Sequence, residues 1–301
     1  MNPASGPSAG DWFQSSNWSP SAIPTTLTAA SIANGGEARA TTTTAPGPIA
    51  VNRLEVGRND GSGTLTSLEV SIQVDSDFDV GEIGGSFATG NVTVDSDGRA
   101  TLSDMDSLVV GFNGDGDLDV GQAGATLGAS ANSRGAVTIE RTGVVQIFGD
   151  VDVGQASADS GSTTLATANL IVVDIDNFSV SGDFDVGPVG GDGMATSMAI
   201  ANLSDVTTAT VGSDIDVGIA SGSSGSVNAG DGRLTITNSS LQVGFDDPLL
   251  PAGLNVGDIS AVDSERAMGS GEVTLQNVQL AVAAGIDVGN LSGGGGVATN
   301  T

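Results

Sequence analysis

The sequence contains no cysteine, histidine, lysine or tyrosine, and each absence argues against a class of chemistry. Without cysteine there is no disulfide framework, iron–sulfur cluster or thiol nucleophile. Without histidine there is no serine–histidine–aspartate triad and no ordinary zinc or copper site. The missing lysine argues against a Schiff-base enzyme and a P-loop nucleotidase. The eight positive charges are therefore all arginine.

Positive charge is scarce, and the chain is strongly acidic. Eight arginines stand against 36 acidic residues, which gives a net charge of −28. Such a charge opposes electrostatic binding to nucleic acid, so no nucleic-acid partner is expected. No run of 18 apolar residues occurs, so no membrane span is expected either. The opening residues 1–12 lack the basic and apolar regions of an export signal.

A short phrase recurs along the chain and predicts its fold. It reads DFDVG at 77–81, and close variants occur before and after it. The phrases end at Gly57, Gly81, Gly121, Gly154, Gly187, Gly218, Gly257 and Gly289. A second phrase, Gly-x-apolar-Thr-apolar, follows each and places an outward threonine column at Thr66, Thr93, Thr138, Thr164, Thr235 and Thr274. A third phrase, an apolar-x-apolar pair, closes each unit. All three alternate with period two, which is the strand signal.

One unit cannot bury its apolar face alone, but stacked units can. We therefore predict an all-β, right-handed parallel β-solenoid of about eight coils, with three short strands in each coil. Variable segments such as 122–134 and 219–232 are expected to be loops. Regular threonine columns also suggest an ice-binding surface, although threonine is simply a good strand residue.

The two ends of the chain differ in composition. Residues 10–24 stand outside the repeat and hold both tryptophans, Trp12 and Trp18. We expect an N-terminal segment and cap over residues 1–48 and solenoid repeats over 49–301, with the C-terminal end open or truncated. Trp12, Phe13 and Trp18 are the predicted self-assembly residues.

The opening from Trp12 to Pro24 and the repeated DVG and Gly-x-Val-Thr phrases resemble a known family. It comprises the β-strand-repeat proteins associated with autotransporters and with the C-terminal sorting signals of Gram-negative secreted proteins. The resemblance covers most of the chain. It implies an exported protein of the cell surface or extracellular matrix, with no catalytic residues assigned.

Aspartates recur beside the apolar residues of the DVG phrase and predict two outward columns. One column is Asp77, Asp117, Asp150, Asp183 and Asp214, and the other is Asp79, Asp119, Asp152, Asp185 and Asp216, continuing to Asp287. Stacked carboxylates roughly 4.8 Å apart repel each other, and converging carboxylate oxygens suit Ca²⁺. The sequence therefore predicts calcium bound along these columns. The alternative is that the aspartates cap turn amides and keep the surface soluble.

These observations favour a non-enzymatic extracellular structural protein. An open C-terminal coil could accept the N-terminal end of another subunit, and such head-to-tail contacts propagate into filaments. The alternatives are a glycan-binding adhesin, which would need exposed aromatics and an extracellular polysaccharide partner, and a fragment of a longer surface protein. A polysaccharide hydrolase is a further alternative, because it needs only two carboxylates and Asp246 and Asp247 interrupt the repeat.

Overall fold

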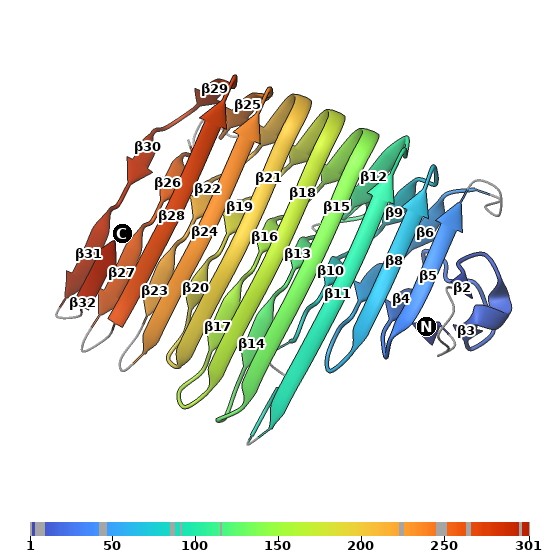
Figure 1. Cartoon of the computed structure of the whole chain (residues 1–301), viewed down its shortest axis with the longest axis horizontal. Helices are drawn as coiled ribbons and strands as arrows, with labels where there is room; N and C mark the ends of the chain where they lie inside the picture. Colours follow the sequence, from blue (N-terminus) through green and yellow to red (C-terminus); the bar gives the residue numbers. More distant parts are fainter. Residues whose placement is uncertain are drawn as a thin grey trace.

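The computed structural model shows a nearly all-β chain wound into a parallel β-solenoid (Figure 1). It describes residues 2–3, 10–41, 47–84, 88–90, 92–114, 116–222, 226–244, 252–262, 266–294 and 297–300. Strands of successive coils pair in parallel with their counterparts, as the repeat predicted. The solenoid fold class is therefore confirmed.

The DVG phrases form one sheet of nine short strands, which we call the DVG sheet. Its register aligns the repeats residue by residue, so that Phe78 pairs with Leu118 and Val80 with Val120. Because these apolar residues alternate, they all face the interior, where they are buried. The strands in spatial order are β4 (Ala29–Ile32), β7 (Arg53–Val56), β10 (Phe78–Val80), β13 (Leu118–Val120), β16 (Val151–Val153), β19 (Phe184–Val186), β22 (Ile215–Val217), β26 (Leu254–Val256) and β30 (Ile286–Val288).

A second sheet of 15 strands, the long sheet, covers the opposite side (Figure 1). Its main strands are β2 (Gly10–Asp11), β5 (Gly36–Thr41), β8 (Ser62–Leu68), β11 (Thr93–Ser103), β15 (Ser130–Ile147), β18 (Thr163–Val180), β21 (Met194–Val211), β24 (Val227–Thr237), β28 (Arg266–Gln276) and β32 (Val297–Asn300). Shorter strands continue it past a bend: β6 (Ile49–Val51), β9 (Ile72–Val74), β12 (Ser107–Val110), β25 (Ser240–Val243) and β29 (Gln279–Val282).

The bend in the long sheet explains why the second and third phrases looked like separate strands. In β15, β18 and β21 they belong to one strand of 18 residues, bent at Arg141, Asp174 and Asp205. Each of these residues has a positive φ, a conformation that aspartate and asparagine tolerate better than most residues. The bend turns the strand's end toward the DVG sheet without breaking the coil.

A third sheet of six strands was missed at the sequence level. Its strands are β14 (Ala123–Ala125), β17 (Ala156–Ala158), β20 (Val189–Gly190), β23 (Ala220–Gly222), β27 (Ile259–Val262) and β31 (Leu291–Gly294). The loop predictions for 122–134 and 219–232 were therefore wrong, because these segments contain β14, β23 and the starts of β15 and β24. Small residues such as Ala123 and Ala125 alternate inward there, and their weak hydrophobicity hid the pattern.

The threonine column also needs correction. The register aligns Thr66, Thr101 and Thr138, because Arg99–Ala100–Thr101 is the true counterpart of the phrase in β11. Thr93 lies earlier in the same strand, and Thr164 is buried. Ile171 and Asn202 interrupt the column in β18 and β21, so it does not form a regular hydroxyl ladder.

Glycines of the DVG phrases lie directly against a row of glycines on the long sheet. This close backbone contact divides the interior of the solenoid. Gly81 has a φ of +73°, and a Cβ on it would lie 1.9 Å from the backbone oxygen of Arg134. On the facing strand, a Cβ on Gly135 would lie 2.2 Å from the backbone nitrogen of Gly121. At these two glycines no side chain fits between the layers, since real atoms do not approach so closely, and further along the same row only the methyl groups of Ala168 and Ala199 are accommodated. The backbone contact separates a large core of Val, Ile, Leu and Phe from a smaller, alanine-rich core under the third sheet.

The N-terminal segment covers the first coil. β1 (Asn2–Pro3) pairs antiparallel with β3 (Trp18–Ser19), and the short 3-10 helix η1 (Ser15–Asn17) lies between β2 and β3. Solenoid strands begin with β4 and β5, so the boundary placed at residue 48 falls after the first coil has begun.

Candidate functional site

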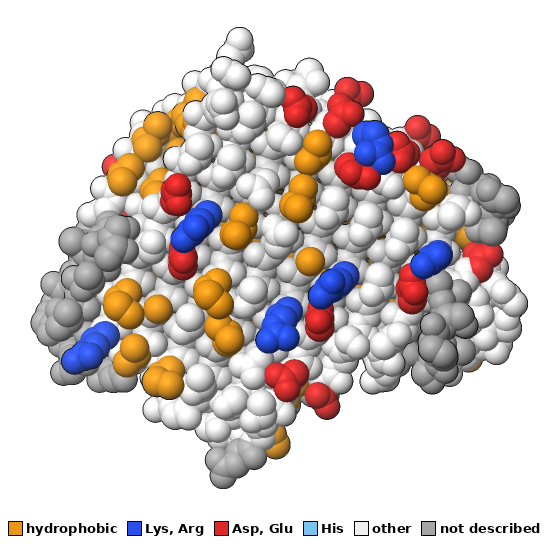
Figure 2. Space-filling model, viewed as in Figure 1, with side chains coloured by type: hydrophobic (Ala, Val, Ile, Leu, Met, Phe, Trp, Pro, Cys, Tyr) orange, Lys and Arg blue, Asp and Glu red, His pale blue; other side chains and the backbone are white. Residues whose placement is uncertain are grey.

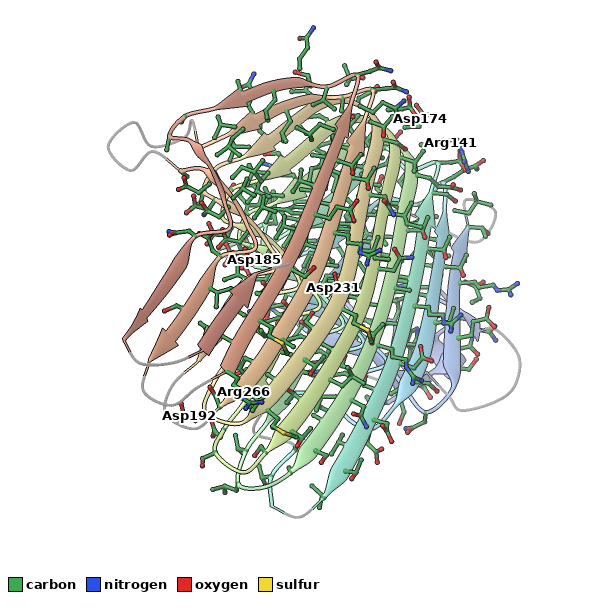
Figure 3. The ribbon with its side chains drawn as sticks, turned by 60° about the vertical axis from the view of Figure 1, so that its left-hand side comes forward. Arg141, Asp174, Asp185, Asp192, Asp231 and Arg266 are labelled. Atoms are coloured by element: carbon green, nitrogen blue, oxygen red, sulfur yellow. The ribbon has the colours of Figure 1, made fainter. Side chains whose placement is uncertain are left out.

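The outer surface is concave where the DVG sheet meets the third sheet, and we call this line the crease. It follows the DVG glycines, whose positive φ turns the chain sharply between the two sheets. The residue before the valine of each DVG phrase points out into the crease. These residues stack in register and form the carboxylate ladder: Asp79, Asp119, Asp152, Asp185 and Asp216. Figure 3 labels Asp185 behind the long sheet and Asp231 on its front face.

The ladder is more buried than the sequence suggested. Asp79 is fully buried, and Asp119 and Asp152 are 8% and 9% exposed. The sequence placed these aspartates on the outward side of their strands, and these three are nevertheless buried, because the outer surface folds inward at the crease. Strand alternation correctly placed them outside the hydrophobic core, but it carries no information on the curvature of that surface.

The second predicted column has a different role, and we call it the cap column: Asp77, Asp117, Asp150, Asp183 and Asp214. The Asp117 carboxylate accepts the backbone N–H of Asp150 at 2.8 Å, and Asp150 does the same for Asp183. The pattern continues from Asp183 to Asp214 at 3.0 Å and from Asp214 to Gly253 at 2.6 Å. The four aspartates from Asp117 to Asp214 therefore each cap the turn of the next coil, which is the alternative considered for these residues, whereas Asp77 lies beside Arg53.

Burial changes the acid–base properties of the ladder. It raises the pKa of Asp152 to about 7 and that of Asp185 to about 9, and neighbouring carboxylates add to both effects. The pKa of Asp119 is raised for the same two reasons. One oxygen, Oδ1, of Asp79, of Asp119 and of Asp185 is buried without a hydrogen-bond partner. A buried, unpaired carboxylate oxygen is costly, so a proton or a cation would stabilise it.

Two arginines neutralise the N-terminal end of the crease. Arg53 donates from Nε to Asp79 Oδ2 at 2.7 Å and lies 3.3 Å from Asp77 Oδ2. Arg58 Nε lies 2.7 Å from Glu82 Oε2, and Arg58 also pairs with Glu55. The pKa of Asp79 still rises to about 7, because its burial outweighs the opposing hydrogen bond from Arg53.

The rest of the crease has amides where the N-terminal end has arginines. Gln155 donates to Asp152 Oδ2 at 3.3 Å, and Gln122 donates to Gln155 Oε1 at 2.7 Å. Asn255 donates to Asp216 at 2.8 Å. Among the residues that the structure describes, Arg53 on Asp79 is the only ion pair to a ladder carboxylate.

The sequence reasoning missed these partners of the ladder, although a positional signal was present. Arg58, Glu82, Gln122 and Gln155 all follow a DVG glycine directly. A polar residue recurring at that position indicates a second row facing the same space.

The ladder is a single column in which each inner carboxylate has one neighbour on either side. Within the described ranges, no group of three or more acidic side chains converges as a metal site by itself. A cation in the crease would therefore lie between carboxylates of neighbouring coils, and amide oxygens and water would complete its six to eight ligands.

The predicted self-assembly residues lie in the N-terminal cap. Trp12 and Trp18 are 1% and 2% exposed and pack edge to face, with ring centroids 4.7 Å apart. Trp18 Nε1 donates to the Trp12 carbonyl at 2.8 Å, which satisfies the buried indole. Phe13 is partly buried against the same core. Of the three aromatic side chains, Phe13 is thus the one that a second molecule could reach.

At the opposite end, the last coil of the DVG sheet exposes residues of the kind that are buried elsewhere. Ile286 is 52% exposed and Val288 is 74% exposed, although their counterparts Leu254 and Val256 are buried. Asp246 and Asp247, the candidate hydrolase residues, lie outside the described residues.

No helix in the described part of the chain is long and apolar enough to cross a membrane. Comparison with protein families, curated proteins and solved structures finds no match to this chain.

Proposed function

We propose that this protein is a non-enzymatic, extracellular structural solenoid whose coils are stabilised by calcium bound in the crease. The observation that carries the proposal is the carboxylate ladder with its buried, unpartnered oxygens on Asp119 and Asp185. The extracellular location rests on the family resemblance of the repeats, and calcium is available in that compartment.

Calcium suits the crease for three chemical reasons. The available ligands are oxygens only, which a hard cation prefers. Their spacing is set by the stacking of coils, and calcium accepts irregular geometry. A cation held between two coils would also remove the repulsion between their carboxylates. Binding would therefore tie one coil to the next.

Calcium dependence of the melting temperature tests this proposal. We expect the protein at about pH 8 to melt several degrees higher in millimolar calcium than in EDTA, because a ligand that binds only the folded state stabilises it. The double variant Asp119→Asn/Asp185→Asn interrupts every pair of neighbouring ladder carboxylates and should lose this response. Asp174→Asn/Asp176→Asn removes the same charge from exposed positions and should retain it. Identical melts of the unmodified protein in EDTA and calcium would refute the calcium site.

A second candidate function is head-to-tail assembly, favoured by the exposed apolar residues of β30. A strand edge with the same register as every other coil can pair with a further parallel strand. A second copy would meet this edge with its N-terminal cap, where Phe13 is accessible. Contacts of this kind are heterologous and therefore extend into filaments.

Electron microscopy and sedimentation test assembly. We expect filaments whose length increases with protein concentration, and Val288→Lys should abolish them by placing a charge at the open edge. Leu127→Lys changes an exposed residue in the turn between β14 and β15 and should leave the filaments intact. Monomers at all concentrations, with and without calcium, would contradict the proposal.

A further inference from the structure

The outward side of the long sheet differs from the rest of this acidic molecule. We use the name mixed face for the outward residues in the first part of each main strand. This part runs from the first residue of the strand to the residue that lies in register with Thr138. Apolar side chains are grouped on its later strands, where Figure 2 shows orange patches between blue and red ones. The exposed members, with exposures of 39% to 51%, are Met194, Met198, Ile200, Val227 and Met268.

Strand pairing shows that these residues form one patch. Met194 on β21 pairs with Val227 on β24, and Ala229 on β24 pairs with Met268 on β28. Met198 and Met268 line a depression of about 200 Å³. Met198 also borders a larger depression of about 640 Å³ that extends across β18 to β11. The surface is therefore both apolar and hollowed.

The charges of the mixed face nearly balance. By count, five arginines face six acidic residues there: Arg39, Arg99, Arg134, Arg233 and Arg266 against Asp11, Glu37, Asp95, Asp97, Asp231 and Glu272. The face sums to 5 − 6 = −1, so almost the whole excess of −28 lies elsewhere. Two copies of this chain repel each other on most approaches, but this face carries almost no net charge that would oppose docking.

We infer that the mixed face is the docking surface for a second copy of this chain, with the two long sheets packed face to face. Two outward rows flank the inward row of Gly98, Gly135 and Gly232, and their charges are complementary. One row contains Asp97 and Asp231, and the other contains Arg99 and Arg233. A two-fold axis that crosses the strands at this row exchanges the two outward rows. Asp97 of one copy then lies opposite Arg99 of the other copy, and Asp231 lies opposite Arg233 of the other copy.

The same operation brings apolar residues together. Met198 and Ile200 flank the axis on β21, so each would face the other in the second copy. A self-complementary patch of this kind closes into a dimer, in contrast to the end contacts proposed above. The dimer and the filament therefore use different surfaces, and each can fail without the other.

Sedimentation equilibrium in EDTA at physiological ionic strength tests the inference, with Val288→Lys present in every protein to exclude end contacts. We expect a reversible dimer, and Met198→Glu/Ile200→Glu should raise its dissociation constant at least tenfold. Leu127→Glu is the matched control, because this residue is 78% exposed and lies outside the mixed face. Circular dichroism melts establish that each variant folds.

A charge exchange provides a second measurement that does not depend on the apolar residues. Arg233→Asp alone should weaken the dimer, because Asp231 and its new neighbour would both be acidic. Asp231→Arg/Arg233→Asp should restore it, since the exchanged pair remains complementary. A monomer at every concentration would overturn the inference. Dimerisation unaffected by Met198→Glu/Ile200→Glu, or a charge exchange without recovery, would also overturn it.

Discussion

The two ends of the crease solve the same electrostatic problem in different ways. At the N-terminal end, Asp79 is fully buried and hydrogen-bonded to Arg53. Further along, Asp119, Asp152 and Asp185 occupy the same position in their coils, without an arginine among the described residues. The pKa of Asp79 rises to about 7, whereas that of the less buried Asp185 rises to about 9.

This difference shows that the repeated backbone buries a carboxylate in each of these coils, whether or not a side chain is present to neutralise it. The backbone geometry is repeated from coil to coil, so each new coil brings another carboxylate into the crease. Protein side chains neutralise the first of them. Protons or external cations must neutralise the others, so calcium should act on the middle of the molecule. Both regions should respond to pH, because the pKa of Asp79 is also raised to about 7, but the response of Asp185 should extend to about pH 9.

The largest expected effect is a loss of stability with rising pH. A folded-state pKa above the ordinary value of 3.8 means that the native state retains its proton where the unfolded state has released it. The contribution of these two carboxyls to stability should thus be highest below about pH 4 and fall up to about pH 7 for Asp152 and about pH 9 for Asp185. Each carboxyl contributes about 1.4 kcal/mol per pH unit in its window.

Thermal melts in EDTA at constant ionic strength measure this profile. Asp152→Asn/Asp185→Asn removes the two titrating groups and should flatten the profile relative to the unmodified protein. A melting temperature that rises with pH over the same range would contradict the assignment.

Removing the arginine should damage the N-terminal end strongly. Arg53→Met leaves Asp79 buried without its partner, and we expect a loss of about 3–5 kcal/mol in the free energy of unfolding, measured with urea. Arg141→Met breaks an exposed pair with Asp104, which is 2.6 Å long and lies outside the mixed face, and should cost much less, because water screens exposed pairs. Equal losses would mean that Arg53 does not neutralise the crease.

The same substitution should have opposite effects in the two regions. At about pH 8, Asp185 is ionised in the unfolded chain but must take up a proton on folding, because its folded-state pKa is about 9. Asp185→Asn needs no proton and should stabilise the protein by at least about 1 kcal/mol. Asp79→Asn deprives Arg53 of its counter-ion and should destabilise it. The gain from Asp185→Asn should shrink at about pH 5, because the pH is then close to the unfolded-state pKa of 3.8 and taking up the proton costs little. Denaturation curves at both pH values check this, and a gain that is equal at both would argue against the raised pKa.

The smallest effect concerns the cap column. Asp150→Ala removes the acceptor for the Asp183 amide, whereas Asp150→Asn removes the charge but keeps the acceptor. The alanine variant should therefore be about 1 kcal/mol less stable than the asparagine variant. The exposed Asp176 is the control, and its two variants should differ by less than about 0.5 kcal/mol.

Much of the fold could be predicted from the repeated phrases, but less of the candidate site. Phe78 and Val80 alternate with polar residues, and this pattern correctly placed them in the interior of a parallel stack. The third sheet was missed because alanines such as Ala123 give a weak signal. The pairing of Arg53 with Asp79 could not be predicted, since it joins residues 26 positions apart across two coils.

The sequence by itself determined the repeat, the inward face of each strand and the order in which the coils stack, because these depend on local alternation and spacing. The tertiary structure decided that the ladder aspartates are buried. Alternation shows on which side of a strand a residue lies, but not whether that side is convex or concave. The contact between Gly81 and the backbone of the facing layer pulls the wall inward. That contact creates the crease and makes a row of outward carboxylates the most perturbed groups in the described chain.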